Sequence, residues 1–161
     1  WTLYTDPSRT NNFSNFVRAI VMSPCPHYVA GPCIQGAPGA ATGGLNAFAP
    51  LDQRVMTHPS VVANQEIVWT ASAIQGSYDI NGKLTLEGIC SYGVTWQLAI
   101  NANVYKNGAI MPGDTASFDF KFVGPLNAGD RVILSLASQP SNDWCDVMLI
   151  DMSVTNSISL P

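Results

Sequence analysis

The sequence is poor in charge. Only 11% of its 161 residues are Asp, Glu, Lys or Arg, whereas an average soluble chain carries roughly 25%. The net charge is −4, and no cluster of Lys or Arg could neutralise a row of phosphates, so we expect no nucleic-acid partner. A surface built mainly from Asn, Ser, Thr, Gly and Ala repels its neighbours weakly, which suits extracellular modules and self-assembling subunits.

The chain also lacks an uninterrupted apolar run. Its longest segment without a charged residue covers 19–51, but five glycines and five prolines in that segment exclude a membrane-spanning helix. Hydrophobic residues make up 47% of the chain, which supports one core in a domain of this length and excludes extended disorder. We therefore expect one folded domain over 1–161 and no membrane span.

Helical periodicity is missing as well, whereas a period of two recurs along the chain. From 94 to 104, apolar residues alternate with polar ones, and a turn at Lys106–Gly108 is expected to close a hairpin. Turn residues at Asn127–Asp130 separate two later strands. Other strands are expected at Phe16–Met22, Glu66–Ala71, Ser77–Leu86 with an interruption at Asn81–Gly82, Ser117–Phe122, Arg131–Ser138 and Asp146–Thr155. The sequence thus predicts an all-β fold, a single antiparallel β-sandwich.

Four cysteines allow three full pairings. Cys25 and Cys33 lie in a turn-rich segment of Pro and Gly, so we expect a bond between them. Cys90 and Cys145 each precede an expected strand, and a bridge between them would tie two strand starts together at one end of the fold. Free structural cysteines and a zinc site are the alternatives, although the chain has no C-x-x-C pair.

Two disulfides imply an oxidising compartment, so we expect a secreted protein. The chain begins at Trp1 without a signal-peptide pattern, as it would after removal of a targeting segment. Asn12-Phe13-Ser14 is a glycosylation sequon, which makes Asn12 a candidate acceptor.

A long Gly- and Pro-rich loop is expected at about 23–50, where neither period is visible. Loops of this length are usually functional or disordered. One interpretation is that the loop covers a sheet edge and blocks aggregation. The others are a binding loop and an arm that docks on a neighbouring subunit.

Catalytic residues are scarce. His27 and His58 are the only histidines, they lack the spacing of zinc ligands, and no G-x-S-x-G motif accompanies them, so we interpret both as surface residues. Glycoside hydrolysis requires two carboxylates that flank the scissile bond, but Glu66 and Glu87 are the only glutamates and most aspartates fall at turns. An aspartate pair is the alternative. We expect no enzymatic activity, no cofactor and no bound metal.

Sugar binding requires aromatic faces with amide or carboxylate groups nearby. Trp69 and Trp96 lie among apolar strand residues and are expected in the core. Trp144 differs because it lies in a polar loop, and a Cys90–Cys145 bond would bring Tyr92 close to it.

The candidate ligand-binding residues are therefore Trp144, Tyr92, Asn142 and Asp143, at one end of the sandwich. The alternative for Trp144 is packing over the disulfide. Ca²⁺ is a further option for Asn142, Asp143 and Asp146, since oxygen ligands on a loop suit it, but their spacing is not that of an EF-hand.

Five short motifs follow one another along the chain: Ile67–Ala71, Gly76–Gly82, Val104–Gly108, Ser117–Phe120 and Leu126–Val132. This ordered series resembles the secreted jelly-roll modules of the carbohydrate-binding type found in bacterial extracellular proteins, and more loosely the complement-type trimeric heads. The similarity covers roughly residues 66–155, with a fainter echo at Thr57–Pro59. The resemblance implies a jelly-roll fold and assigns no functional residue.

These observations predict a non-catalytic extracellular β-sandwich module that binds carbohydrate or a cell-surface polymer. The alternative is a self-assembling structural subunit, a homo-oligomer that builds an extracellular filament, coat or capsid-like shell.

Overall fold

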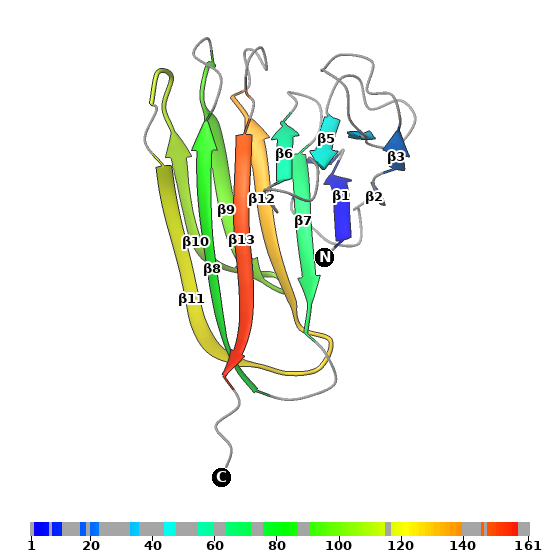
Figure 1. Ribbon diagram of the computed structural model, residues 1–161, viewed down its shortest axis with the longest axis vertical. Helices are drawn as coiled ribbons and strands as arrows, with labels where there is room; N and C mark the ends of the chain where they lie inside the picture. Colours follow the sequence, from blue (N-terminus) through cyan, green and yellow to red (C-terminus); the bar gives the residue numbers. More distant parts are fainter. Residues whose placement is uncertain are drawn as a thin grey trace.

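The chain folds into two antiparallel sheets (Figure 1). The computed structural model describes residues 2–6, 8–10, 17–18, 20–22, 33–35, 44–47, 55–59, 64–71, 76–86, 91–114, 117–139, 146 and 148–157. Sheet A has the strand order β10-β9-β12-β7-β1-β2, and sheet B has the order β11-β8-β13-β6-β5-β4-β3. The strands of sheet A are β1 (Thr2–Asp6), β2 (Val17–Arg18), β7 (Asn64–Thr70), β9 (Val94–Ile100), β10 (Asn103–Ile110) and β12 (Arg131–Ser138). Those of sheet B are β3 (Ile20–Met22), β4 (Cys33–Gln35), β5 (Gly44–Ala47), β6 (Val55–His58), β8 (Gly76–Leu86), β11 (Ser117–Leu126) and β13 (Met148–Ser157).

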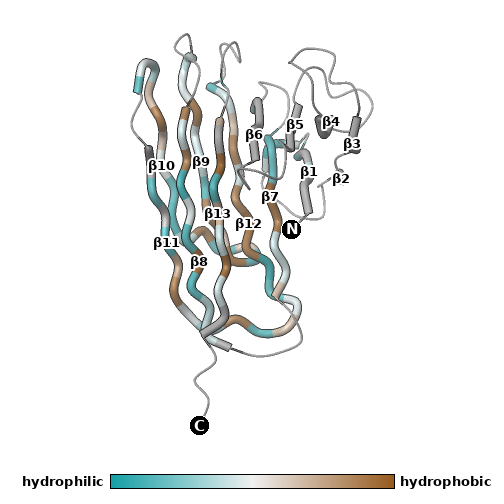
Figure 2. Tube along the Cα trace, in the orientation of Figure 1, coloured by the Kyte–Doolittle hydropathy of each residue, from teal (hydrophilic) through white to brown (hydrophobic). Residues whose placement is uncertain are grey.

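The hydrophobic core lies between the two sheets, because alternate side chains of each long strand point inward. Val94 and Leu98 of β9 are buried in one cluster with Leu134 of β12 and with Ile80 and Leu84 of β8. Figure 2 shows hydrophobic and hydrophilic residues alternating along the long strands. The antiparallel β-sandwich predicted from this alternation is confirmed.

The two tryptophans expected in the core lie there. Trp96 is only 6% exposed and belongs to the core cluster. Trp69 packs against the same cluster, and its ring meets that of Tyr78 edge to face with the centroids 5.2 Å apart. Both are therefore packing residues, as the sequence predicted.

The hairpin between β9 and β10 turns earlier than predicted. Lys106–Gly108 lie inside β10, so the expected turn there is wrong, and the chain reverses at Asn101–Ala102 instead. Asn101 has a φ of 55°, a left-handed conformation that Asn tolerates better than most residues. Asn-Gly commonly marks a turn, but here Gly108 leaves room for the indole of Trp96 against the backbone.

Further boundaries differ from the expectation. The expected strand Phe16–Met22 contains two strands, β2 in sheet A and β3 in sheet B. β8 continues through Asn81–Gly82 without the expected interruption, because β11 pairs with it on one side and β13 on the other. His58, interpreted from the sequence as a surface residue, is the last residue of β6. By contrast, β12 has the bounds predicted for it, and the expected turn at Asn127–Asp130 is present, with Asp130 N donating to Asn127 O at 3.1 Å.

We expected the segment 23–50 to be a loop throughout, but it is not. It contains β4 and β5, which pair with β3 and β6 and so extend sheet B. β1 was not expected at all; it pairs with β7 in sheet A. These short strands have too few residues to show a period, and it is their pairing with neighbours that holds them extended. No helix in the described part of the chain could span a membrane.

Candidate functional site

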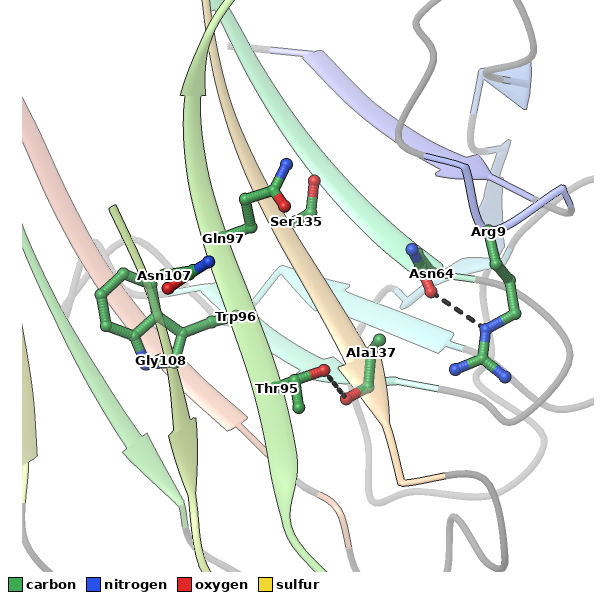
Figure 3. Close-up of a pocket in the computed structure, with 9 residues that line it drawn as sticks. All are labelled: Arg9, Asn64, Thr95, Trp96, Gln97, Asn107, Gly108, Ser135 and Ala137. Atoms are coloured by element: carbon green, nitrogen blue, oxygen red, sulfur yellow. Dashed lines mark hydrogen bonds between the residues drawn. The ribbon is translucent and has the colours of Figure 1, made fainter. Parts of the chain in front are cut away.

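A pocket of about 390 Å³ opens on sheet A, over β12, β9 and β10 and beside the segment that follows β1 (Figure 3). Its lining is rich in amide and hydroxyl side chains. The lining residues are Arg9, Asn64, Thr95, Trp96, Gln97, Asn107, Gly108, Ser135 and Ala137.

The strand period directs these side chains to the outer face of sheet A. On β9, Thr95 and Gln97 alternate with buried core residues, so both point away from sheet B. The register places Gln97 beside Ser135 of β12 and beside Asn107 of β10. Because adjacent strands lie about 4.8 Å apart, Asn107, Gln97 and Ser135 form a polar row across three strands.

Arg9 reaches the pocket from a tight turn after β1. Its φ is 54°, and its backbone nitrogen donates to Asp6 O at 3.2 Å. The guanidinium donates from Nε to Asn64 Oδ1 and from Nη2 to Ser138 O, both at 3.3 Å. The buried carboxylate of Asp6 closes the turn by accepting bonds from Ser8 N at 3.0 Å and Ser8 Oγ at 2.5 Å. A fixed cation therefore borders an otherwise uncharged lining.

Glu66 of β7 lies fully buried beside this pocket, between β1 and β12. Ser135 Oγ donates a hydrogen bond to its Oε2, whereas its Oε1 has no partner among the described residues. Burial raises the pKa of Glu66 to about 9; the hydrogen bond from Ser135 opposes this rise, and the negative charge of Asp6 adds to it. Glu66 is consequently a neutral carboxylic acid at pH 7.

A small apolar cluster continues this face of sheet A away from the polar row. Val68, Ala99 and Ile133 are buried, and Tyr4 packs against them. Ile133 lies opposite Val68 on one side and Ala99 on the other. Close packing of these side chains restrains the strands that carry Glu66, Ser135 and Gln97.

The candidate residues derived from the sequence fall elsewhere. Tyr92 is 50% exposed at one end of the sandwich. Asp146 is buried there and accepts bonds from Ser91 Oγ at 2.5 Å and Tyr92 N at 3.2 Å. The direct neighbours of Cys90 and Cys145 are thus hydrogen-bonded to each other. Trp144, Asn142, Asp143, Asn12, Cys25, Cys90 and Cys145 lie outside the described residues, and Cys33 lies in β4.

Both disulfides and the Trp144 site stay predictions. Calcium at Asn142, Asp143 and Asp146 is likewise untested. Within the described ranges, no three His, Cys, Asp or Glu residues come close enough to hold a metal ion.

Sequence reasoning missed the pocket. The alternation along β9 did identify Thr95 and Gln97 as the outward-facing residues. Glu66 carried a signal too, since a charged residue followed by Ile67 and Val68 in an expected strand calls for a buried partner. Nothing in the sequence could have brought Arg9 to these strands, because they are more than fifty positions away.

No protein-family model and no curated protein sequence matches the chain. Its fold is similar to several solved structures. One is the CBM51 of a Clostridium perfringens GH95 in complex with methyl-galactose, with a TM-score of 0.49 and 14% identity over 64% of this chain and 69% of that one. Another contains CBM51-2 in complex with GlcNAc and the INT domains of Clostridium perfringens ZmpB, with a TM-score of 0.44 and 14% identity over 65% and 22%.

A third is the Podospora anserina GH26-CBM35 β-(1,4)-mannanase, with a TM-score of 0.40 and 18% identity over 68% and 23%. The chain thus spans less than a quarter of the length of the second and third structures.

Proposed function

We propose that this chain is a non-catalytic carbohydrate-binding module that holds its ligand in the pocket on sheet A. The observation that carries the proposal is the polar row of Asn107, Gln97 and Ser135, which lines one pocket from three adjacent strands. Each amide offers both donors and an acceptor, and the Ser135 oxygen, whose proton is donated to Glu66, offers an acceptor. Such side chains match the neighbouring hydroxyls of a sugar, each of which also donates and accepts.

The composition of the lining supports a binding role without chemistry on the ligand. Hydrolysis of a glycosidic bond needs two carboxyl groups that flank it. None of the described lining residues is a carboxylate, and Glu66 is buried behind Ser135. Ala137 adds a small apolar surface to this lining. An extracellular location and a glycan or cell-surface polymer as partner complete the proposal.

Affinity gel electrophoresis against a panel of neutral polysaccharides tests this proposal. The double variant Gln97→Ala/Asn107→Ala removes two side chains of the polar row, and we expect about thirtyfold weaker retention, since each lost hydrogen bond costs about 1 kcal/mol. Asn103→Ala is the matched control, because Asn103 is exposed on the same strand as Asn107 and does not line the pocket. Equal retention of the double variant and the wild type would contradict the pocket as the site.

The same gels test the alternative location at the end of the sandwich. Trp144→Ala should abolish retention with little change in thermal stability if Trp144, Tyr92, Asn142 and Asp143 hold the glycan. A large loss of stability would assign Trp144 to packing instead. Runs with EDTA and with added Ca²⁺ test the calcium option at the same loop.

A further inference from the structure

Glu66 is a buried acid next to the pocket. Ligand binding through the polar row does not involve it directly. It is fully buried, yet Asn64, two residues before it, and Ser135, its hydrogen-bond donor, both line the pocket. Its Oε1 is buried without a partner among the described residues. A half-satisfied carboxyl group in this place is costly, which calls for an explanation beyond packing.

We propose that Glu66 is a positioning residue: its buried carboxyl group accepts the hydrogen bond that fixes the Ser135 hydroxyl in the pocket lining, and the water that an ionised Glu66 would draw into the pocket disables the site. The inference rests on the proposed function and adds a form of regulation to the same pocket. Ser135 is itself almost fully buried, so the hydroxyl that faces the ligand depends on Glu66 as its partner.

The groups around Glu66 explain why ionisation would disturb the pocket. On β1, the buried carboxylate of Asp6 repels a second negative charge, and Tyr4 lies opposite Glu66 in the register. Arg9, a cation in the pocket lining, donates to Asn64 Oδ1 and to Ser138 O. β12 contributes Ser135 here and carries its only charge at its start, Arg131, while the outward residues of β9 are uncharged. An ionised Glu66 therefore requires water, which has to enter beside Ser135 where the ligand binds.

Thermodynamic linkage between ligand binding and protonation of Glu66 determines whether the affinity rises or falls with pH. A ligand that fills the pocket removes water near Glu66, which disfavours the charged form and raises the pKa of Glu66 further above 9. By reciprocity, the ligand binds more tightly while Glu66 is protonated. Affinity should be constant at neutral pH and fall as the pH rises through the pKa of the free protein, by about tenfold for each unit by which the ligand raises that pKa.

The chain offers a direct test without ligand, because Glu66 and Glu87 are its only glutamates. Glutamate labelled with ¹³C at Cδ gives two resonances, which the variant Glu87→Gln assigns. We expect the Glu66 resonance to titrate in the alkaline range, and the side-chain amides of Gln97 and Asn107 to shift with the same midpoint. Titration of Glu66 in the acid range, or amides that do not follow it, would overturn the inference whether or not a glycan is known.

Binding measurements complete the test. With a polysaccharide retained by the wild type, affinity between pH 7 and 10 should fall at least threefold in the wild type and in Glu87→Gln, and show no such fall in Glu66→Gln. Ser135→Ala should weaken retention at every pH. A wild-type affinity as flat as that of Glu66→Gln would overturn the inference and leave the proposed function intact. Retention of no glycan at any pH would overturn the proposed function, while the ¹³C titration still decides the state of Glu66.

Discussion

Glu66 couples the stability of the whole domain to a single proton. Its pKa is about 9 in the folded chain, compared with an ordinary value of 4.5. Between these two values the folded state keeps a proton that the unfolded state releases, so stability decreases as the pH rises. The stabilising contribution of the protonated acid is complete below about pH 4.5 and is lost as the pH rises towards 9.

The variant Glu66→Gln should remove this dependence, since an amide of the same shape stays neutral at every pH. We expect it to be more stable than the wild type at pH 8, with a difference that grows by up to about 1.4 kcal/mol per pH unit between the two pKa values. Urea unfolding at pH 5, 7 and 8.5 measures the difference, with Glu87→Gln as the control. The prediction would be contradicted if the free energy of unfolding changed with pH equally in the wild type and in Glu66→Gln.

Gly108 tests the packing of the pocket wall. A Cβ built on Gly108 would lie 2.8 Å from Cε2 and Nε1 of Trp96, a rigid ring in the core. We therefore expect Gly108→Ala to destabilise the fold by about 1–3 kcal/mol through overpacking. Asn107→Ala changes the neighbouring residue, whose side chain is exposed, and should lower the free energy of unfolding much less. Denaturant unfolding compares the two variants, and equal midpoints would show that Trp96 moves aside freely.

At the scale of elements, the β9–β10 turn is fixed by contacts with another turn as well as by its own conformation. Asn101 Nδ2 donates to Asp130 Oδ1 at 3.0 Å, and Arg131 N donates to Asn101 Oδ1 at 2.9 Å. The bond from Asn101, followed by that from the Asn127 backbone, lowers the pKa of Asp130. The stabilisation from these bonds to the carboxylate is present above the ordinary pKa of 3.8 and is lost as the pH falls below it.

Asn101→Ala should therefore destabilise the fold by about 1–2 kcal/mol, because alanine is strained at this φ and makes neither bond. It should also move the pKa of Asp130 upwards, towards 3.8. Thermal unfolding and an NMR titration of the aspartates measure the two effects. Asn103→Ala, an exposed position two residues on, is the control. An unchanged Asp130 pKa in Asn101→Ala would show that the hydrogen bonds from Asn127 alone are responsible.

The elements could be predicted from the sequence where they are long, and most clearly where one face of the strand is buried and the other is exposed. β9 alternates visibly, and β12, which turn residues bound on both sides, has the predicted bounds. Prediction failed where pairing, rather than pattern, holds the backbone extended, as in β1, β4 and β5. It also failed at Gly108, where a turn-forming residue serves the packing of Trp96.

At the scale of the whole molecule, the disulfides are the main untested element. The hydrogen bond from Ser91 to Asp146 joins the residues that follow Cys90 and Cys145. We expect two bridges, Cys25–Cys33 and Cys90–Cys145. Loss of each bridge should lower the free energy of unfolding by about 2–4 kcal/mol. Unfolding curves with and without reductant measure the change, and alkylation of four thiols in the native protein would refute both bridges and the inference of secretion.

Self-assembly into an extracellular structure stays the alternative role for this chain. β10 ends sheet A, but its register shifts between Val104 and Lys106, and Lys106 Nζ donates to Asp119 O of β11. An irregular strand with a lysine is a poor template for pairing with another chain. Light scattering on the native protein distinguishes a monomer from a large assembly.

Local pattern alone determined that this chain is an all-β sandwich, that Trp69 and Trp96 pack in its core, and that catalysis has few candidate residues. These properties follow from the amino-acid composition and from the period of two, and that period depends only on residues close together in the sequence. The pocket and the neutral state of Glu66 were decided only by the tertiary structure. They depend on the register that places Ser135 beside both Glu66 and Gln97 and on the turn that carries Arg9 to Asn64. Contacts between residues so distant along the chain leave no periodic trace in the sequence.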